Sequence, residues 1–298
     1  MIIKNKFYDE VKKLKGIKVF KDASLKNDNN MRIDAICLCK IEIYSYQNLR
    51  KLFEIISNYK YPYLILGKGS NVLFLNKYYE CVIIKLMPIN SKYLNIVYAG
   101  DSLNFVNTKL ISNGIASLNF LSGVPCSIGG AICMNAGAFN CEMKDIIEYV
   151  YYLDLKDLKI KVINNDACCF SYRNSIFKEE KCLILGAKIK LIHDKKEEIL
   201  NKHHNYLQLR NNKLPLEFPN LGSIFKNPNN DHAGRIIDKL GLKGLGFKGA
   251  KVSDKHANVI VNFNNATGED VLKLIEIIED LVYIKYKTKL EREIIIFK

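Results

Sequence analysis

Short apolar runs separated by polar turns make up the first two-thirds of the chain. Runs of this length, rich in β-branched residues, are typical of strands. We therefore expect strands over residues 33–43, 63–66, 72–75, 81–86, 94–98, 147–155, 158–163 and 182–192. Apolar residues recur at helical spacing from Ser45 to Tyr59 and from Asp101 to Asn113, and Gly114 ends the second of these helices. This mixture predicts an α+β fold.

Beyond about residue 194 the pattern becomes more helical. A helix start is indicated by a side-chain acceptor followed three residues later by an acidic side chain. We expect a helix over 194–209 opened by Asp194 and Glu197, a short helix capped by Asp231 and ended by Gly241, a long helix opened by Thr267 and Asp270, and strands over 257–262 and 293–297. These elements predict a second, smaller α+β domain.

An uncharged stretch, LSGVPCSIGGAICMNAGAF from Leu121 to Phe139, is the most informative local feature. Its glycines are expected to permit positive φ and to bring backbone N–H groups close to a diphosphate; they are Gly123, Gly129, Gly130 and Gly137. About fifty residues earlier, GKGSN follows one apolar run and precedes another. Two Gly-rich turns at strand ends are suited to close on one phosphate-bearing ligand.

The earlier turn does not match the two common phosphate motifs. Pro62 stands where GxxxxGK[ST] requires its first glycine, and Val72 stands where GxGxxG requires its third. The alternative interpretation of this turn is an ordinary β-hairpin.

Charge and length narrow the function classes. The 298 residues are enough for two or three packed units, and Lys plus Arg outnumber Asp plus Glu by 45 to 31. Because the positive charge is spread along the chain, we expect it to gather small anions and not to bind nucleic acid. The chain shows neither an apolar run of membrane-spanning length nor a signal-peptide h-region. We expect a cytoplasmic protein without membrane insertion or an evident obligate protein partner.

The nine cysteines form no CxxC pair and lie mostly among apolar residues. Buried reduced thiols are therefore expected in place of disulfides or metal ligands, and no metal site is expected.

Seven blocks between roughly residues 30 and 296 carry a family resemblance: LGKGSNVLF, GVPCSIGGAICMNAGAF, SYRNSIFK, PNLGSIFKNP, AGRIIDKLGLKG, VSDKHANVIVN and LEREI. In this order they resemble the UDP-N-acetylenolpyruvoylglucosamine reductases, flavoenzymes that make UDP-N-acetylmuramate for bacterial peptidoglycan. The short interval between the SYRNS and GSIFKNP blocks is similar to the subtype without an inserted tyrosine-bearing loop.

The resemblance implies an α+β architecture with a flavin-binding region of the vanillyl-alcohol oxidase type. That region is expected over residues 1–195, in two subdomains of about 1–88 and 89–195, and a substrate-binding domain over 196–298. The implied cofactor is non-covalent FAD, with NADPH as co-substrate and a UDP-sugar as substrate. The residues implied around the FAD diphosphate are Gly67, Gly69, Ser70, Asn71, Gly123, Ser127, Gly129, Gly130, Asn135 and Gly137.

Three catalytic residues are implied by matching motifs. Ser223 matches the serine that protonates C2 of the enolpyruvyl group after hydride transfer from flavin N5 to C3. Arg173 and Glu293 match the pair that polarises the substrate carboxylate, where negative charge develops. Without the motifs, Ser223 reads as a turn residue, Arg173 as a surface ion-pair partner and Glu293 as an exposed carboxylate.

The resemblance also implies substrate-binding residues: Tyr172, Lys213, Asn227, His256 and Asn258. Lys213 suits a diphosphate as a point charge and Asn227 as an amide donor. On its own, Lys213 also fits a solvated surface, and His256 also fits a structural histidine.

Several positions depart from the family pattern. Asp34 and Ala35 replace two glycines near the N-terminal block, which places flavin contacts from that loop in question. Cys126 replaces a glycine and would be strained if its backbone needs positive φ. Leu221 replaces a common alanine and Arg292 a common proline, and both changes are expected to be tolerated.

Two alternatives to the reductase remain from the sequence. One is a sugar or lactone oxidase of the same flavin fold, which would usually carry a covalent flavin and lack the GSIFKNP block. The other is a degenerate paralogue that binds FAD or a UDP-sugar for regulation, an interpretation that Cys126 and the lost glycines favour.

Overall fold

The computed structural model describes residues 2–298 and divides by packing into two compact units. Unit 1 holds the residues up to Ala23, Cys37–Gly67 and Glu80–Leu207; unit 2 holds Ser24–Ile36, Lys68–Tyr79 and Gln208–Lys298. The N-terminal half of the chain thus contributes two short segments to unit 2. The division into functional regions at residues 195 and 196 stays a prediction, because packing does not assign ligands.

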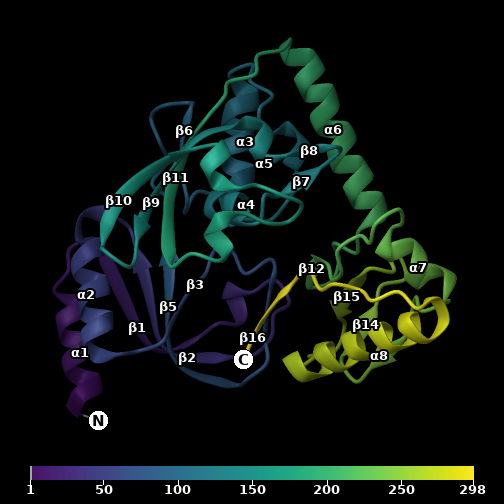
Figure 1. The fold of residues 1–298 in the computed structure, drawn as a ribbon, viewed down its shortest axis with the longest axis horizontal. Coiled ribbons are helices and arrows are strands. Elements are labelled where there is room, and N and C mark those ends of the chain that lie inside the picture. Colours follow the sequence, from purple (N-terminus) through teal and green to yellow (C-terminus); the bar gives the residue numbers. More distant parts are fainter. Residues whose placement is uncertain (1) are drawn as a thin grey trace. The chain divides into compact units, whose positions relative to one another are not determined.

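The first half of unit 1 is a sheet covered by two helices. The sheet has the order β1-β2-β5-β3, from Ile17–Ser24, Ile36–Ile43, Tyr78–Leu86 and Tyr63–Ile65. Helices α1 (Ile2–Lys12) and α2 (Leu49–Tyr59) contact each other and lie beside this sheet (Figure 1). Their apolar faces, including Phe7 and Phe53, share one core with strand residues such as Ile41 and Ile84.

The second half of unit 1 is an antiparallel sheet with its own core. Its order is β10-β9-β11-β6, from Lys159–Asn164, Ile147–Asp154, Cys182–Ile189 and Ile96–Tyr98. Its other elements are α3 (Leu103–Ser112), α4 (Ile128–Cys133), α5 (Met143–Ile146), the two-residue strands β7 (Gly137–Ala138) and β8 (Cys141–Glu142), and the part of α6 (Lys196–Lys213) up to Leu207. Helix α4 contacts β6 and β11, so the Gly-rich stretch is packed directly onto this sheet.

Unit 2 contains an antiparallel sheet, two complete helices, the end of α6 from Gln208 and a parallel strand pair. The sheet order is β12-β15-β14-β13, from Asn220–Ser223, Val259–Asn262, Ala250–Val252 and Gly246–Phe247. Helices α7 (Ala233–Lys239) and α8 (Gly268–Tyr286) contact each other, and α8 packs on β13 and β14. Strands β4 (Val72–Phe74) and β16 (Ile295–Phe297) pair in parallel.

Most predicted elements are present. The helix predicted over 45–59 is α2, the one ended by Gly114 is α3, and every predicted strand overlaps an observed one. Thr267 and Asp270 form the expected reciprocal capping box of α8. The buried face of α8 includes the apolar residues Val271, Leu274, Ile275, Ile278 and Val282.

The hairpin interpretation of the GKGSN turn is wrong. Strands β3 and β4 flank the turn but do not pair with each other. Strand β3 pairs with β5, and β4 pairs with β16 more than 200 residues away in sequence, as the register Ile295–Val72 shows. The turn therefore leads from a sheet of unit 1 to a strand pair of unit 2.

Three local expectations need correction. Of the glycines in the uncharged stretch, Gly123 has a positive φ of 77°, whereas Gly129, Gly130 and Gly137 do not. Helix α6 begins at Lys196, and Asp194 accepts hydrogen bonds from the backbone of Lys195 and the side chain of Lys202 in place of a reciprocal box with Glu197. The N-cap residue of α7 is His232, with Asp231 accepting from its backbone N–H.

The sequence patterns also missed elements. Helix α1, strand β1, helix α4 and the short strands β12 to β14 were not predicted. Helix α4 escaped because two of its six residues are glycines, which have low helix propensity.

All nine cysteines are free thiols, and Cys37, Cys39, Cys81, Cys126 and Cys168 are buried. Within residues 2–298, no helix has the length and apolarity to cross a membrane. Over the same range, no group of three His, Cys, Asp or Glu side chains is arranged to hold a metal ion.

Candidate functional site

The two Gly-rich turns meet inside unit 1. A Cβ built on Gly67 would lie 2.6 Å from the Oγ of Ser127. Ser127 is the N-cap of α4, and its Oγ accepts a hydrogen bond from the backbone N–H of Gly130 at 3.3 Å. Only glycine at position 67 therefore fits against this hydroxyl without displacing it. The arrangement suits a diphosphate, because a hydroxyl and a helix start lie directly beside a glycine turn.

The remaining glycines of the stretch serve packing and turn geometry. The N–H of Gly129 donates to Ala99 O at 2.9 Å, and a Cβ there would lie 2.9 Å from the Cβ of Ala99. The N–H of Gly123 donates to the side chain of Asn104 at 3.1 Å. Cys126 is buried and is absent from the residues with positive φ, so the cysteine is not strained at this family glycine position.

Unit 2 contains the second part of the GKGSN turn. Gly69 has a φ of 63°, and a Cβ there would lie 2.1 Å from Asp28 O, so no other residue fits. Its own carbonyl accepts from the N–H of Asn30 at 3.0 Å. The loop that departs from the family pattern therefore supports the turn through its backbone. Ser70 is half-buried in the same turn.

The catalytic candidates of unit 2 lie on adjoining backbone segments. Ser223 ends β12, and the next residue, Ile224, accepts a hydrogen bond from the N–H of Glu293 at 2.8 Å. Phe225 and Arg292 form an isolated antiparallel bridge beside this contact. The structure thus brings the Ser223 and Glu293 segments together, although they are far apart in sequence.

Arg173 lies in unit 1 at the tip of a tight turn. Its φ is 55°, which is unusual for a residue with a side chain. Its Nη2 donates to Gly137 O at 3.1 Å, and its guanidinium lies 5.1 Å from the ring centroid of Tyr172. A Cβ on Gly137 would approach Cys141 O to 2.7 Å, so glycine is required where Arg173 is held.

A pocket of about 390 Å³ in unit 2 collects several of the predicted residues. This volume is in the range of small-molecule sites. Ser223, Asn227, His256 and Asn258 line it, together with His232, Gly234, Arg235, Asp238, Lys243, Lys255 and Ala257. The candidate proton donor is therefore in the same cavity as most of the predicted substrate-binding residues.

Three cations of this pocket were missed from the sequence: Arg235, Lys243 and Lys255. Each forms an ion pair, Arg235 with Asp231, Lys243 with Asp238 at 3.0 Å and Lys255 with Glu217 at 3.0 Å. They lie in the AGRIID, LKG and DKH segments of the family blocks, and this position was the sequence signal that could have identified them. Exposed ion pairs contribute little stability, about 0–1 kcal/mol, so an anionic ligand can replace the carboxylate partners of these three cations.

His256 is held as a neutral imidazole. Burial lowers its pKa, and the nearby cations Lys243 and Lys213 lower it further. Its Nδ1 accepts a hydrogen bond from the N–H of Asn258 at 3.2 Å, which requires an unprotonated nitrogen. Gly234 provides space for the ring, since a Cβ there would lie 3.2 Å from its Cε1.

Asn258 and Asn227 organise the pocket walls. The side chain of Asn258 accepts from the N–H of Phe225 at 3.0 Å and donates to Phe225 O at 2.8 Å, fixing the strand that ends at Ser223. The Oδ1 of Asn227 accepts from the N–H of Ala233 and so caps the first turn of α7. Lys213 ends α6 outside the pocket lining, and Tyr172 lies in unit 1.

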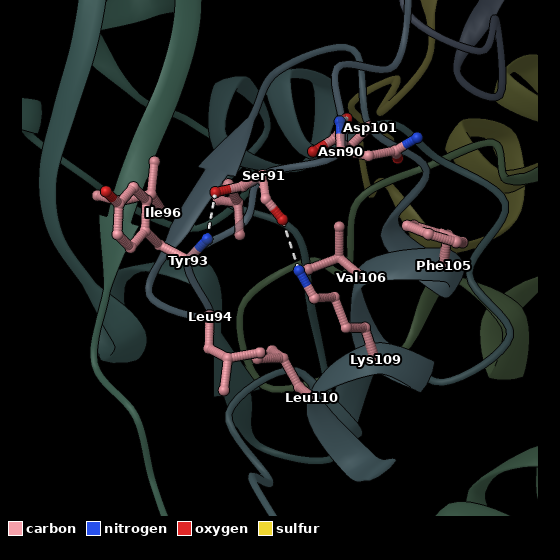
Figure 2. Close-up of a pocket in the computed structure, with 11 residues that line it drawn as sticks. Asn90, Ser91, Tyr93, Leu94, Ile96, Asp101, Phe105, Val106, Lys109 and Leu110 are labelled. Carbon is pink, nitrogen blue, oxygen red and sulfur yellow. Dashed lines mark hydrogen bonds between the residues drawn. The ribbon is translucent and has the colours of Figure 1, made fainter. Parts of the chain in front are cut away.

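A second cavity lies in unit 1 between the β5–β6 loop and α3 (Figure 2). Asp101 accepts from the backbone of Ile89, Asn90 and Tyr98, and Lys109 donates to Ser91 O at 2.5 Å. Its volume of about 20 Å³ holds about one water molecule. It contains none of the predicted site residues and is a feature of loop packing.

Comparison with known proteins gives matches over both parts of the chain. Residues 39–161 match the model of an FAD binding domain, and residues 214–297 match the C-terminal domain of UDP-N-acetylenolpyruvoylglucosamine reductase. The reductase of that name from Caldanaerobacter subterraneus is 39% identical over 254 residues, covering 84% of each chain. The one from Carboxydothermus hydrogenoformans is 34% identical over 98% of each chain.

The solved structures agree. The UDP-N-acetylenolpyruvylglucosamine reductase of Thermus caldophilus superposes with a TM-score of 0.81 at 28% identity, covering 95% of this chain and 99% of that one. The similarity extends over both compact units and confirms the predicted fold class.

Proposed function

The chain belongs to the UDP-N-acetylenolpyruvoylglucosamine reductase family, and we propose that it reduces UDP-N-acetylenolpyruvoylglucosamine to UDP-N-acetylmuramate, a peptidoglycan precursor, with FAD and NADPH. The observation that supports this most strongly is the pocket of about 390 Å³ that combines Ser223 with the cations Arg235, Lys243 and Lys255. A UDP-sugar needs such a cavity, because its diphosphate requires cations and its sugar requires volume.

The residues present fit FAD. Gly67 lies against the Ser127 hydroxyl, which a Cβ at position 67 would displace, and Ser127 caps the start of α4. Gly67, Gly69, Ser70, Asn71, Gly123, Ser127, Gly129, Gly130 and Gly137 are the residues proposed to form or support the diphosphate site. When bound, FAD supplies hydride chemistry that no amino-acid side chain provides.

The chain's own residues bind the substrate and move the proton. Lys243, Lys255 and Arg235 exchange their carboxylate partners for the diphosphate, assisted by Lys213 and Asn227. Neutral His256 and the amide of Asn258 present uncharged contacts beside Ser223, and Tyr172 completes the proposed substrate residues.

Ser223 donates its hydroxyl proton to C2 of the enolpyruvyl group as the hydride reaches C3. Until this proton arrives, the hydride leaves negative charge at C2 and on the substrate carboxylate, which Arg173 binds as a permanent cation and Glu293, when protonated, binds as a hydrogen-bond donor. A serine hydroxyl is a weak acid, so it acts only against a strongly basic carbon. The backbone contact between Ile224 and Glu293 supports this pairing of roles.

NADPH and the UDP-sugar are multiply charged and do not cross an apolar bilayer unaided. We therefore extend the proposal to action in the cytoplasm, where NADPH is the available reductant.

Colour changes of the purified protein test the proposal. The protein should be yellow, NADPH should bleach it under anaerobic conditions, and UDP-N-acetylenolpyruvoylglucosamine should restore the colour while gaining one hydride and one proton. Bleaching by NADPH without restoration by the UDP-sugar would contradict the reductase and favour a flavin-binding paralogue. Cys126 has no positive φ, so backbone strain at this position does not favour that paralogue.

A further inference from the structure

The turn that carries Arg173 is closed on itself. The N–H of Ser171 donates to Asn174 O, and the N–H of Asn174 donates to Ser171 O, both at 3.1 Å. Arg173 occupies the third position of this turn with a φ of 55°. Turns that need positive φ at this position favour Gly or Asn, so arginine is kept there only if the surroundings hold the turn.

One short segment of unit 1 holds this turn at alternate residues. Cys133 O accepts from the hydroxyl of Ser175 at 2.6 Å, the side-chain amide of Asn135 donates to Ser171 O at 2.9 Å, and Gly137 O accepts from Arg173 at 3.1 Å. The first residue of the turn, the residue that follows it and the side chain at its tip are therefore all bonded to residues 133–137.

The hydrogen bonds of the Asn135 side chain support this turn and leave no donor for contact with a ligand. This side chain has no exposed surface. Its Oδ1 accepts from the N–H of Lys144 at 3.0 Å, and its Nδ2 donates to Glu142 Oε2 at 3.0 Å as well as to Ser171 O. Its backbone N–H donates to Ile132 O. Both amide protons are thus used within the described chain, and none is left for the FAD diphosphate.

The backbone explains why the residue is an asparagine. Asn135 has a φ of 43°, a region in which Asn and Asp are several-fold enriched over other side chains. One residue must adopt this φ, donate twice and accept once. Aspartate fits the backbone but has no donor, and glycine fits the backbone but has no side chain.

We propose that Asn135 and Ser175 are positioning residues for Arg173. They act on catalysis through this arginine and contact neither FAD nor substrate. This inference rests on the proposed role of Arg173 in binding the substrate carboxylate. It reassigns Asn135 from the flavin site to the support of the catalytic arginine.

The test uses the FAD-loaded protein with Asn135→Gly and Ser175→Ala. Glycine at 135 keeps the positive φ without strain. Asn165→Ala is the matched control, because Asn165 donates to Lys144 O at 2.6 Å and Ile147 O at 2.8 Å in the same unit but does not bond to the Arg173 turn. Hydrogen exchange of the Asn174 amide, followed by mass spectrometry, reports on the turn directly. Asn135→Gly should speed this exchange at least about tenfold, while Asn165→Ala leaves it unchanged.

The second measurement is the rate at which the UDP-sugar reoxidises the NADPH-reduced protein. Asn135→Gly should slow this rate at least about tenfold in the wild-type background, because misplacing a catalytic group by about 1 Å costs up to about 10²-fold. In an Arg173→Ala background the same substitution should change it by less than about twofold, because nothing is left to position.

The outcomes separate the two proposals. A wild-type rate in Arg173→Ala would remove the proposed role of Arg173 and this inference with it. If reoxidation is slow in Arg173→Ala but normal in Asn135→Gly, the positioning role alone is overturned. The same holds if reoxidation is slow in Arg173→Ala and Asn135→Gly slows it equally in both backgrounds. Unchanged exchange of Asn174 in Asn135→Gly would also overturn it.

Discussion

The side-chain amide of Asn71 donates a hydrogen bond to the backbone carbonyl of Glu293 at 3.1 Å. The carbonyl of Asn71 in turn accepts from the N–H of Ile295 at 2.9 Å. Asn71 precedes β4 and Glu293 precedes the parallel strand β16, so both lie at the same end of one strand pair. The predicted flavin turn and the predicted catalytic carboxylate are thereby connected through a single side chain.

Asn71→Ala should disturb both stability and catalysis. Loss of the amide leaves the carbonyl of Glu293 without this donor, which costs about 1–3 kcal/mol of the free energy of unfolding. We expect the substrate-driven reoxidation to slow about tenfold, because Glu293 loses a backbone anchor. Chemical denaturation and single-turnover absorbance measure the two effects. Wild-type values in both would show that the contact is incidental.

Elements with local signals were predictable from the sequence. The reciprocal box of Thr267 and Asp270 marks the start of α8, and Gly114, with a φ of 72°, follows the end of α3. The partner of β4 was not predictable, because β16 lies at the other end of the chain and parallel pairing leaves no local pattern. The hairpin interpretation failed for that reason.

Only those site residues that lie in the family blocks were predictable from the sequence. The blocks identified Ser223, Asn227, His256 and Asn258, which the structure brings into one pocket. The blocks did not distinguish residues that contact a ligand from residues that position such contacts. Asn135 lies in one of these blocks, and its side chain already donates to Glu142 and Ser171 and accepts from Lys144, which only three-dimensional contacts reveal.

Gly67→Ala should weaken FAD binding while preserving the fold. The new Cβ would lie 2.6 Å from Ser127 Oγ and would displace it from the N–H of Gly130. We expect the Kd for FAD to rise at least about tenfold, a change of about 1.4 kcal/mol. Titration of the apoprotein with FAD, followed by flavin fluorescence, measures this. Gly246→Ala is the control, since its nearest neighbour would be 3.6 Å away, and equal affinities in both variants would contradict the site.

Lys243→Met should weaken binding of the UDP-sugar. The substitution removes a cation from the pocket and leaves Asp238 without its partner at 3.0 Å, so both changes disfavour an anion. Charged hydrogen bonds contribute about 1.5–3 kcal/mol, which corresponds to about a 10- to 160-fold rise in Kd. Calorimetric titration measures it, with Lys273→Met on α8 as the exposed control. An unchanged Kd in Lys243→Met would exclude this pocket as the diphosphate site.

His256 should make the stability depend on pH. Its pKa in the folded protein is lowered below the ordinary value of 6.5, mainly by burial. Above that value the imidazole is neutral in both states and its contribution is complete. As the pH falls from there through the lowered pKa, the unfolded chain takes up the proton first, and stability declines by up to about 1.4 kcal/mol per pH unit.

Denaturation of the wild type and of His256→Gln across this pH range checks the prediction. The difference between the two free energies of unfolding should shrink as the pH is lowered. Parallel curves would show that His256 titrates normally in the folded protein.

Single-turnover kinetics of Ser223→Ala test the central claim most directly. Bleaching of the flavin by NADPH should remain within about twofold of the wild-type rate, because no proton from Ser223 is needed in that half-reaction. Reoxidation by UDP-N-acetylenolpyruvoylglucosamine should slow by about 10²- to 10⁴-fold, the usual contribution of a general acid. Equal losses in the two halves, or a wild-type rate of reoxidation, would contradict the assignment of Ser223 as the proton donor.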